Sequence, residues 1–166
     1  MGYNTFVASY RISQLKPDQV DAFFTLYEQI VWSDFKEWTK ESKERWIKED
    51  YSPDFWKNLV QEGKCPVFVA YEGEKMIGYV AIETLNFGVA YLGWVGILKD
   101  HRGKGLAREI VSASEEWGKR TGVHKIELET QVIDLLPFFL KLGFTLEGVR
   151  HNSWQGLDNY MFGKEI

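Results

Sequence analysis

The run Arg102-Gly103-Lys104-Gly105-Leu106-Ala107 constrains the fold most strongly, because of what lies on either side of it. An apolar stretch at 91–98 precedes it and has the character of a strand. Apolar residues at helical spacing follow it: Leu106, Ile110, Ala113 and Trp117. Two glycines let the backbone turn tightly with its N–H groups outward, and the helix adds the positive end of its dipole. The sequence therefore predicts a strand, a phosphate-binding turn and a helix, in that order.

Two better-known phosphate loops do not match this run. A Walker A loop needs Ser or Thr after Gly-Lys, whereas Lys104 is followed by Gly105 and Leu106. A dinucleotide-binding fingerprint needs a third glycine and an acidic residue about twenty positions further on. On this motif alone, an ordinary glycine-containing turn between a strand and a helix stays open.

The pattern R-x-x-G-x-A at 102–107 resembles the pyrophosphate-binding motif of the GNAT superfamily, the acetyl-CoA-dependent N-acetyltransferases. A second match lies at 135–144, which is similar to that family's short helix ending in leucine, glycine and phenylalanine. The segments 143–149 and 154–161 are similar to the closing hairpin of many members, including those that act on ribosomal-protein N-termini. The resemblance in specific motifs covers 91–161, and the N-terminal half agrees only in its order of elements.

The resemblance implies one acetyltransferase domain over 1–166 with an α+β fold, three layers α/β/α around a mixed, mostly antiparallel sheet. It implies acetyl-CoA as cosubstrate, with the pyrophosphate held by the backbone of Gly103, Lys104, Gly105, Leu106 and Ala107 and by the charges of Arg102, Lys104 and Arg108. It places the N–H donor for the developing oxyanion near Val95, Gly96 and Ile97. Proteins of this kind are commonly dimers, so a homodimer is possible.

Composition agrees with one compact domain and excludes several classes of protein. The chain has 166 residues, 45% of them hydrophobic, which is enough for a core without disulfides. The single cysteine, Cys65, rules out an internal disulfide and a cysteine-based metal cluster, which is compatible with a cytoplasmic protein. We expect no signal peptide and no membrane span. A net charge of -4 argues against nucleic-acid binding and slightly favours cationic partners.

The remaining pattern predicts alternating elements. We expect a strand over 5–12, a helix opened by Pro17, and a largely helical segment over 32–61 that restarts at Ser52-Pro53 and ends at Gly63. A hairpin is predicted around 72–74, and a strand over 125–129. Asp134 is expected to cap a helix that carries Pro137 in its first turn.

Amide formation needs a proton acceptor, because a primary amine has a pKa near about 10 and is protonated at neutral pH. Glu127 falls where ribosomal-protein-alanine acetyltransferases, which the chain resembles, carry a glutamate, and Glu129 lies two residues on, on the same face of the strand. Glu83 is a weaker candidate. The alternative for Glu127 and Glu129 is that both are solvent-facing carboxylates paired with Lys125 or a neighbour.

The general acid departs from the family pattern. Phe138 or Phe139 stands where many members carry a tyrosine, and Val132 stands where an asparagine usually contacts the pantetheine arm, with Gln131 beside it. Tyr160 is a candidate acid if its hydroxyl reaches the CoA sulfur. His101 is expected to face solvent, His124 and His151 have no Asp or Ser at an informative spacing, and the three histidines and Cys65 show no metal-site spacing.

Aromatic side chains crowd the segment from Trp32 to Trp56. They are explained by packing of helices on the sheet, which we favour, or by lining of the acceptor site.

With the resemblance to the GNAT superfamily, the sequence predicts transfer of an acetyl group from acetyl-CoA to a primary amine, on a small molecule or a peptide N-terminus, by direct attack in a ternary complex. The alternative is a catalytically weak CoA-binding or peptide-binding module on the same scaffold.

Overall fold

A single seven-stranded sheet forms the centre of the computed structural model, which describes residues 10–166. The strand order is β1-β2-β3-β4-β5-β7-β6, and within the described residues only β4 and β5 pair in parallel. The strands are β1 (Arg11–Gln14), β2 (Val67–Glu72), β3 (Lys75–Asn86), β4 (Val89–Ile97), β5 (Lys125–Thr130), β6 (Thr145–Arg150) and β7 (Asn159–Glu165). The expected α+β class with a mixed, mostly antiparallel sheet is confirmed.

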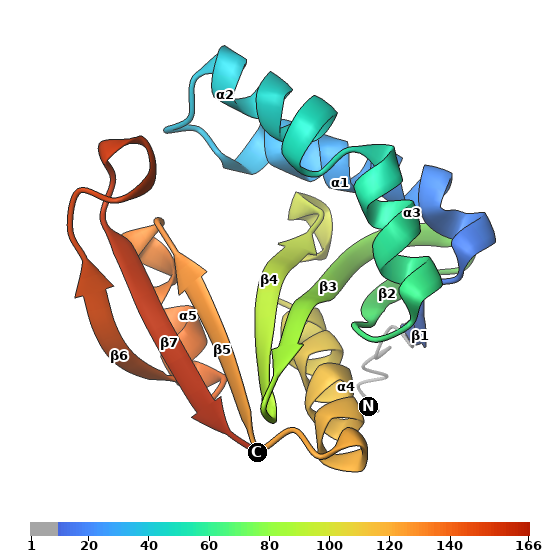
Figure 1. Cartoon of the computed structure of the whole chain (residues 1–166). Coiled ribbons are helices and arrows are strands. Elements are labelled where there is room, and N and C mark those ends of the chain that lie inside the picture. The colour runs from blue at the N-terminus through green and yellow to red at the C-terminus, as the bar shows by residue number, and fades with distance from the viewer. Residues whose placement is uncertain (1–9) are drawn as a thin grey trace, which may run out of the picture.

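Helices cover both faces of this sheet (Figure 1). They are α1 (Val20–Asp34), α2 (Lys40–Arg45), α3 (Pro53–Glu62), α4 (Leu106–Thr121) and α5 (Leu136–Lys141). One hydrophobic core lies beneath α4 and α5 and includes Ile110, Leu128 and Phe139. A second core lies beneath α1 and α3 and includes Phe23 and Trp56. No helix within residues 10–166 is long and apolar enough to cross a bilayer.

Local signals explain several of the boundaries. The Ser52 side chain accepts a hydrogen bond from the Phe55 N–H at 3.4 Å at the start of α3, and Gly63 ends this helix with a φ of 67°. Both features are as predicted. Asp134 was expected to cap the helix that carries Pro137, and this is wrong. Asp134 lies inside a 3-10 turn that continues directly into α5, so that Leu135, whose side chain cannot accept a hydrogen bond, takes the capping position.

Two further predictions differ from the structure. Of the strand expected over 5–12, residues 5–9 lie outside the described residues, and the strand that is described, β1, runs from Arg11 to Gln14. The helical stretch expected over 32–61 is broken at Phe35 and Tyr51, which leave helical geometry. The Thr39 hydroxyl accepts a hydrogen bond from the Ser42 N–H at 3.1 Å and starts a new helix, because a capping side chain satisfies an N–H that a continuous helix would bond internally.

The two central strands separate along their length. β4 and β5 pair only where Val89–Tyr91 lies beside Lys125–Glu127, and their upper parts diverge (Figure 1). The β3–β4 register changes at the same level, because Ala81 pairs with Trp94 and Ile82 with Leu92, leaving Gly93 as an extra residue. Such a bulge bends a strand. Among residues 10–166, the part of β4 beyond Tyr91 therefore has no strand partner on its β5 side.

Candidate active site

The predicted phosphate turn joins the upper end of β4 to α4. Gly103 and Gly105 have φ values of 75° and 85°, in the left-handed region that favours glycine. A Cβ built on either glycine would meet no atom within 4 Å, so glycine is required here by backbone conformation and not by space. Gly105 is the N-cap of α4, so the unpaired N–H groups of the first helical turn lie directly behind the turn. This arrangement suits an anion.

Three cations surround the turn, and they are engaged differently. Arg102 donates from Nε to the Ile97 carbonyl at 2.8 Å and forms an ion pair with Asp34 at the end of α1. Lys104 donates to the Asp100 carbonyl at 2.8 Å, and Arg108 to the Lys141 carbonyl at 3.0 Å. The charge of Arg102 is therefore balanced by a carboxylate of the protein, whereas Lys104 and Arg108 are exposed and bonded to carbonyl groups.

The opening between β4 and β5 presents backbone groups of β4. The Leu98 N–H donates to the Ile77 carbonyl of β3 at 2.9 Å. Because backbone groups alternate along a strand, the N–H groups of Ile97 and Val95 point to the other side, toward the opening. Gly96 has a different role, since the Tyr79 ring covers the space where its side chain would be.

Glu83 lies on β3 beside this opening, on the face covered by α1 and α3. Its Oε2 accepts a hydrogen bond from the Tyr51 hydroxyl at 3.1 Å, and its Oε1 is buried without a partner. The carboxyl group lies over Gly93, where a Cβ would collide with it. Burial raises the pKa of Glu83 to about 7, and the side chains of Tyr51 and Trp94, which favour the charged carboxylate, oppose this rise. The carboxyl group thus changes charge near neutral pH.

Glu127 and Glu129 share one face of β5, as predicted, because Leu128 between them faces the opposite core. Glu127 accepts from Lys125 Nζ at 2.9 Å. Glu129 accepts from Arg150 at 3.3 Å and from Asn159 Nδ2 at 2.6 Å. Both carboxylates are paired with cations, which is the arrangement given above as the alternative to catalysis; their catalytic role stays a prediction.

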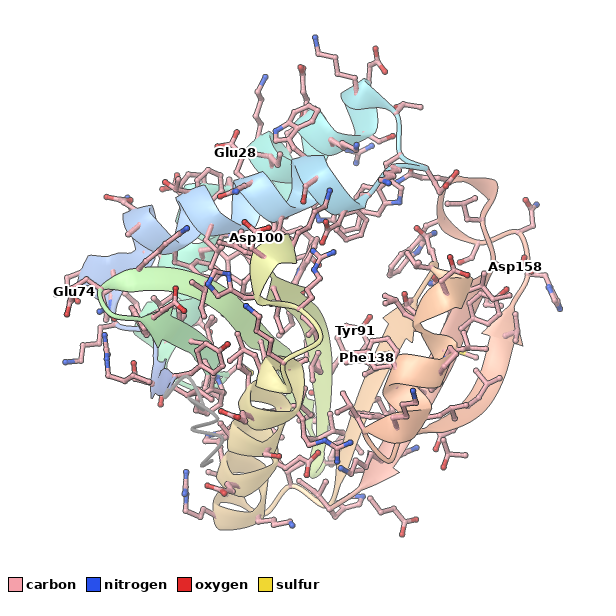
Figure 2. All side chains as sticks on the ribbon, turned by 180° about the vertical axis from the view of Figure 1, so that it is seen from behind. Glu28, Glu74, Tyr91, Asp100, Phe138 and Asp158 are labelled. Atoms are coloured by element: carbon pink, nitrogen blue, oxygen red, sulfur yellow. The ribbon has the colours of Figure 1, made fainter. Side chains whose placement is uncertain are left out.

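Tyr160 lies on β7 opposite Thr130 and packs against the core beneath α5. It is therefore on the other side of the sheet from Glu83, and its role as acid stays a prediction. Phe139 is buried in the same core with 5% exposure. Phe138 lies on the edge of α5 that faces the opening (Figure 2).

His101 was expected to face solvent, and this is wrong. It is 8% exposed, and its Nε2 lies 3.1 Å from Glu72 Oε2. The reason is the 3-10 turn at Lys99–His101, which turns the side chain inward just before the phosphate turn. His151 lies 3.0 Å from Asp158 in the exposed β6–β7 loop. Within residues 10–166, no three or more His, Cys, Asp or Glu side chains are grouped to hold a metal ion.

A series of aromatic rings starts at Tyr51, the hydrogen-bond partner of Glu83, and we call five of these rings the aromatic wall: Trp38, Trp46, Tyr51, Trp94 and Trp154. The ring centroids of Trp46 and Tyr51 are 5.2 Å apart and nearly parallel, at 10°. Those of Tyr51 and Trp94 are 5.1 Å apart, those of Trp38 and Trp46 4.5 Å, and those of Trp46 and Trp154 6.5 Å. Packing explains Trp56, which is fully buried, whereas Trp46 and Tyr51 are only half-buried.

Sequence reasoning missed Trp94, Trp154 and Gln131 as site residues. Trp94 stands in a strand whose alternation is reset by the Gly93 bulge, and a bulge has no reliable signal in one sequence. Trp154 comes from the β6–β7 loop, 60 positions further along the chain. Gln131 was noted only as the neighbour of Val132.

The model of the acetyltransferase (GNAT) family matches residues 27–144, well over half of the chain. The chain belongs to the GNAT acetyltransferase family. It is 30% identical over 104 residues to N-alpha-acetyltransferase 30 of Schizosaccharomyces pombe, covering 59% of this chain and 69% of that protein. It is 23% identical over 101 residues to streptothricin acetyltransferase of Escherichia coli, covering 60% and 58%. The predicted family and the predicted acyltransferase class, with acetyl-CoA as acyl donor, are confirmed.

Solved structures share the whole fold. The PaiA N-acetyltransferase of Thermoplasma acidophilum, solved with coenzyme A, superposes with a TM-score of 0.81 at 18% identity, over 95% of this chain and 99% of that one. The ribosomal-protein-alanine N-acetyltransferase of Brucella melitensis gives 0.76 at 18% identity, over 94% and 99%. At this identity the likeness establishes the fold of a GNAT acetyltransferase.

Proposed function

We propose that this GNAT protein transfers the acetyl group of acetyl-CoA to a primary amine, with Glu83 as the proton acceptor. Acetyl-CoA, when bound, supplies an acetyl group activated as a thioester. The residues present fit it: the N–H groups at 103–107 suit the pyrophosphate, with Lys104 and Arg108 adding charge, and the Val95 and Ile97 N–H groups line the opening.

The position of Glu83 carries this proposal. Its carboxyl group lies beside the place where β4 and β5 part, its Oε1 has no partner, and its pKa of about 7 suits a base at neutral pH. Glu127 and Glu129, by contrast, are each engaged in an ion pair with a basic side chain. Glu83 takes the first proton from the ammonium group so that the neutral nitrogen can attack the thioester carbonyl. The C–N bond forms, the C–S bond breaks, and the second proton that the nitrogen loses neutralises the departing CoA thiolate. Direct attack in a ternary complex needs no residue that carries the acetyl group.

The experiment follows CoA release with acetyl-CoA and a panel of amines, including polyamines, amino acids and peptides with free N-termini. We expect the wild-type rate to rise with pH through about 7, because Glu83 must lose its proton first. The Glu83→Gln variant is expected to lose about 100-fold or more in kcat, together with this pH dependence.

The matched variant is Glu127→Gln, which removes a carboxylate of the same type on β5, on the other side of β4. It is expected to keep both the rate and the pH profile. If the two variants exchange these results, Glu127 is the base, as the sequence alone suggested.

A binding module without activity is the second candidate. Phe139 favours it, because this residue has no proton to give and is buried in the core where many GNAT enzymes carry a tyrosine. Binding of acetyl-CoA without acetylation of any amine in the panel would establish this alternative.

A further inference from the structure

Gln131, at the end of β5, joins two segments that are far apart in the chain. Its Oε1 accepts a hydrogen bond from the Trp38 indole N–H at 3.0 Å, and its Nε2 donates to the Trp154 carbonyl at 2.7 Å. The orientation of the amide is fixed by its partners, because an indole only donates and a carbonyl only accepts. Gln131 therefore ties the α1–α2 loop to the β6–β7 loop.

The β6–β7 loop that receives this bond has an internal structure of its own. Asp158 accepts from the Asn152 N–H at 3.0 Å, and the Ser153 N–H donates to the Leu157 carbonyl at 2.8 Å. Asn152 and Gln155 have φ values of 49° and 60°, a conformation that side chains other than glycine adopt only when their surroundings impose it. The loop thus holds Trp154 in a defined place.

Trp154 begins a continuous series of contacts that ends at Glu83. Its ring lies 6.5 Å from that of Trp46, which stacks on Tyr51, whose hydroxyl donates to Glu83. Trp154 is 50% exposed, so the series runs from the surface to the buried carboxyl group. Glu83 Oε1, at the inner end, is an acceptor that lacks a donor.

Three carboxylates that flank the aromatic wall are paired with arginines, whereas Glu83 has no ion-pair partner among residues 10–166. Asp34 pairs with Arg102, Asp50 lies 3.7 Å from Arg45, and Glu129 is held by Arg150. One ammonium group can be received by Glu83 and by ring faces. An acceptor molecule with a second ammonium group, or with many hydroxyl groups, would place those groups against aromatic rings. They would lose their hydration there, which is unfavourable.

We infer that the acceptor is a primary amine attached to a flat apolar group, and that Gln131 is a positioning residue that holds the aromatic wall for it. This inference rests on the proposed function. The chemistry is shared by two sources, a free arylalkylamine and the N-terminal residue of a peptide that begins with an aromatic side chain. The ring of either would contact Trp46 and Trp154 while the amine donates to Glu83 Oε1.

The test compares kcat/KM at saturating acetyl-CoA for 2-phenylethylamine, putrescine, and two tetrapeptides that begin with phenylalanine or with serine. We expect 2-phenylethylamine or the phenylalanine peptide to exceed its polar counterpart by about tenfold or more, the effect of burying one ring. The better of the two identifies the source. Equal or better use of putrescine and the serine peptide would overturn the inference and leave the proposed function standing, whereas no acetylation of any probe by protein that binds acetyl-CoA would overturn both.

The role of Gln131 is tested with Gln131→Ala. Loss of both hydrogen bonds is expected to raise KM for the preferred probe about tenfold, while kcat and its pH profile stay unchanged, because Glu83 is not altered. Trp154→Ala, which removes the outer ring and leaves Gln131 in place, is expected to raise KM likewise. Gln29→Ala, on the exposed side of α1, is the matched control and should change neither constant. An unchanged KM in both Gln131→Ala and Trp154→Ala would contradict the inference.

Discussion

The two sides of the β4–β5 opening are built in different ways. The donor side, formed by the end of β4, the turn and α4, uses backbone N–H groups that follow one another over 95–107. The acceptor side uses the side chains of Glu83, Tyr51, Trp94 and Trp154, which come from four separate parts of the chain. A site made of consecutive backbone leaves a motif in the sequence, and a site made of converging side chains does not.

The two sides also differ in what they cost the folded state. Within residues 10–166, most of the buried polar side-chain atoms that lack a partner lie on the sheet face covered by α1 and α3, the face that carries the acceptor side: Tyr27 Oη, Tyr71 Oη, Tyr79 Oη, Glu83 Oε1 and the indole nitrogens of Trp46, Trp56 and Trp94. Burial of a polar group without a hydrogen bond is unfavourable. The acceptor side therefore gives up stability that the core beneath α4 retains, as functional sites commonly do.

The largest expected effect tests this difference directly. The raised pKa of Glu83 means that the folded state binds the proton more tightly than the unfolded state, so stability is lost as pH rises from about 4.5 to about 7. We expect Glu83→Gln to raise the free energy of unfolding at pH 8 by up to about 3 kcal/mol, and to change it little at pH 4. Urea denaturation at the two pH values measures this.

The control is Glu127→Gln, which removes an ion-paired carboxylate and should give no gain at pH 8. An equal gain from Glu83→Gln at both pH values would show that the carboxyl group carries no cost of ionisation, and the contrast between the two sides would fail.

Backbone geometry on the donor side is tested next. Gly105→Val forces a branched side chain into a φ of 85° and shifts the N–H groups at the start of α4. We expect acetyl-CoA to bind about 30-fold more weakly by calorimetry. Gly63→Val is the matched control, since Gly63 has a φ of 67° with equally open surroundings but ends α3. Gly63→Val should lose a similar amount of stability and keep its affinity for acetyl-CoA. Weaker binding of acetyl-CoA in both variants would contradict a specific role for the turn.

The junction between the two sides gives a smaller effect. Gly93→Ala places a methyl group against Glu83 Oε1 and should displace the carboxyl group, lowering kcat about tenfold with unchanged affinity for acetyl-CoA. Gly148→Ala is the control, because its methyl group would meet only the flexible end of Met161. A weaker affinity for acetyl-CoA in Gly93→Ala, with unchanged kcat, would mean that Gly93 serves the donor side.

The smallest effect separates two roles of Arg102. Lysine keeps the positive charge but loses the Nε donor to the Ile97 carbonyl, so Arg102→Lys should lower the free energy of unfolding by about 1 kcal/mol and leave acetyl-CoA binding within about threefold. Thermal unfolding and calorimetry check the two parts. Weaker binding at unchanged stability would instead support the role in holding the pyrophosphate that the sequence suggested.

Much of the fold was predictable because its signals are local. Ser52 and Gly63 mark the ends of α3, Gly73 lies in the β2–β3 turn, and Leu106 and Ile110 begin the apolar face of α4. Asp134 misled because it has the right residue type for a cap, but the preceding 3-10 turn removed the need for one. His101 misled because the same kind of short turn directs its side chain inward.

The geometry of the glycine turn at 102–107 was predictable from the sequence, whereas the surroundings of Glu83 were not. The positive φ values at Gly103 and Gly105 are favoured by glycine itself, so the residue type alone indicates the turn. Glu83 gains its raised pKa from burial and from its position over Gly93, both of which exist only after β3 and β4 have paired out of register. Glu127 fitted the family pattern, but Lys125, two residues away, is its ion-pair partner, which the sequence offered as the alternative to a catalytic role.

The short parallel pairing of β4 with β5 limits the number of backbone hydrogen bonds that join the two halves of the sheet. Val89–Tyr91 and Lys125–Glu127 make a hinge of three residue pairs between two half-sheets. A nucleotide bound in the opening and in contact with both half-sheets would stabilise their relative position. Its binding should therefore slow amide hydrogen exchange in both β4 and β5. Saturation with the acyl donor would then stiffen the aromatic side as well, before any amine arrives.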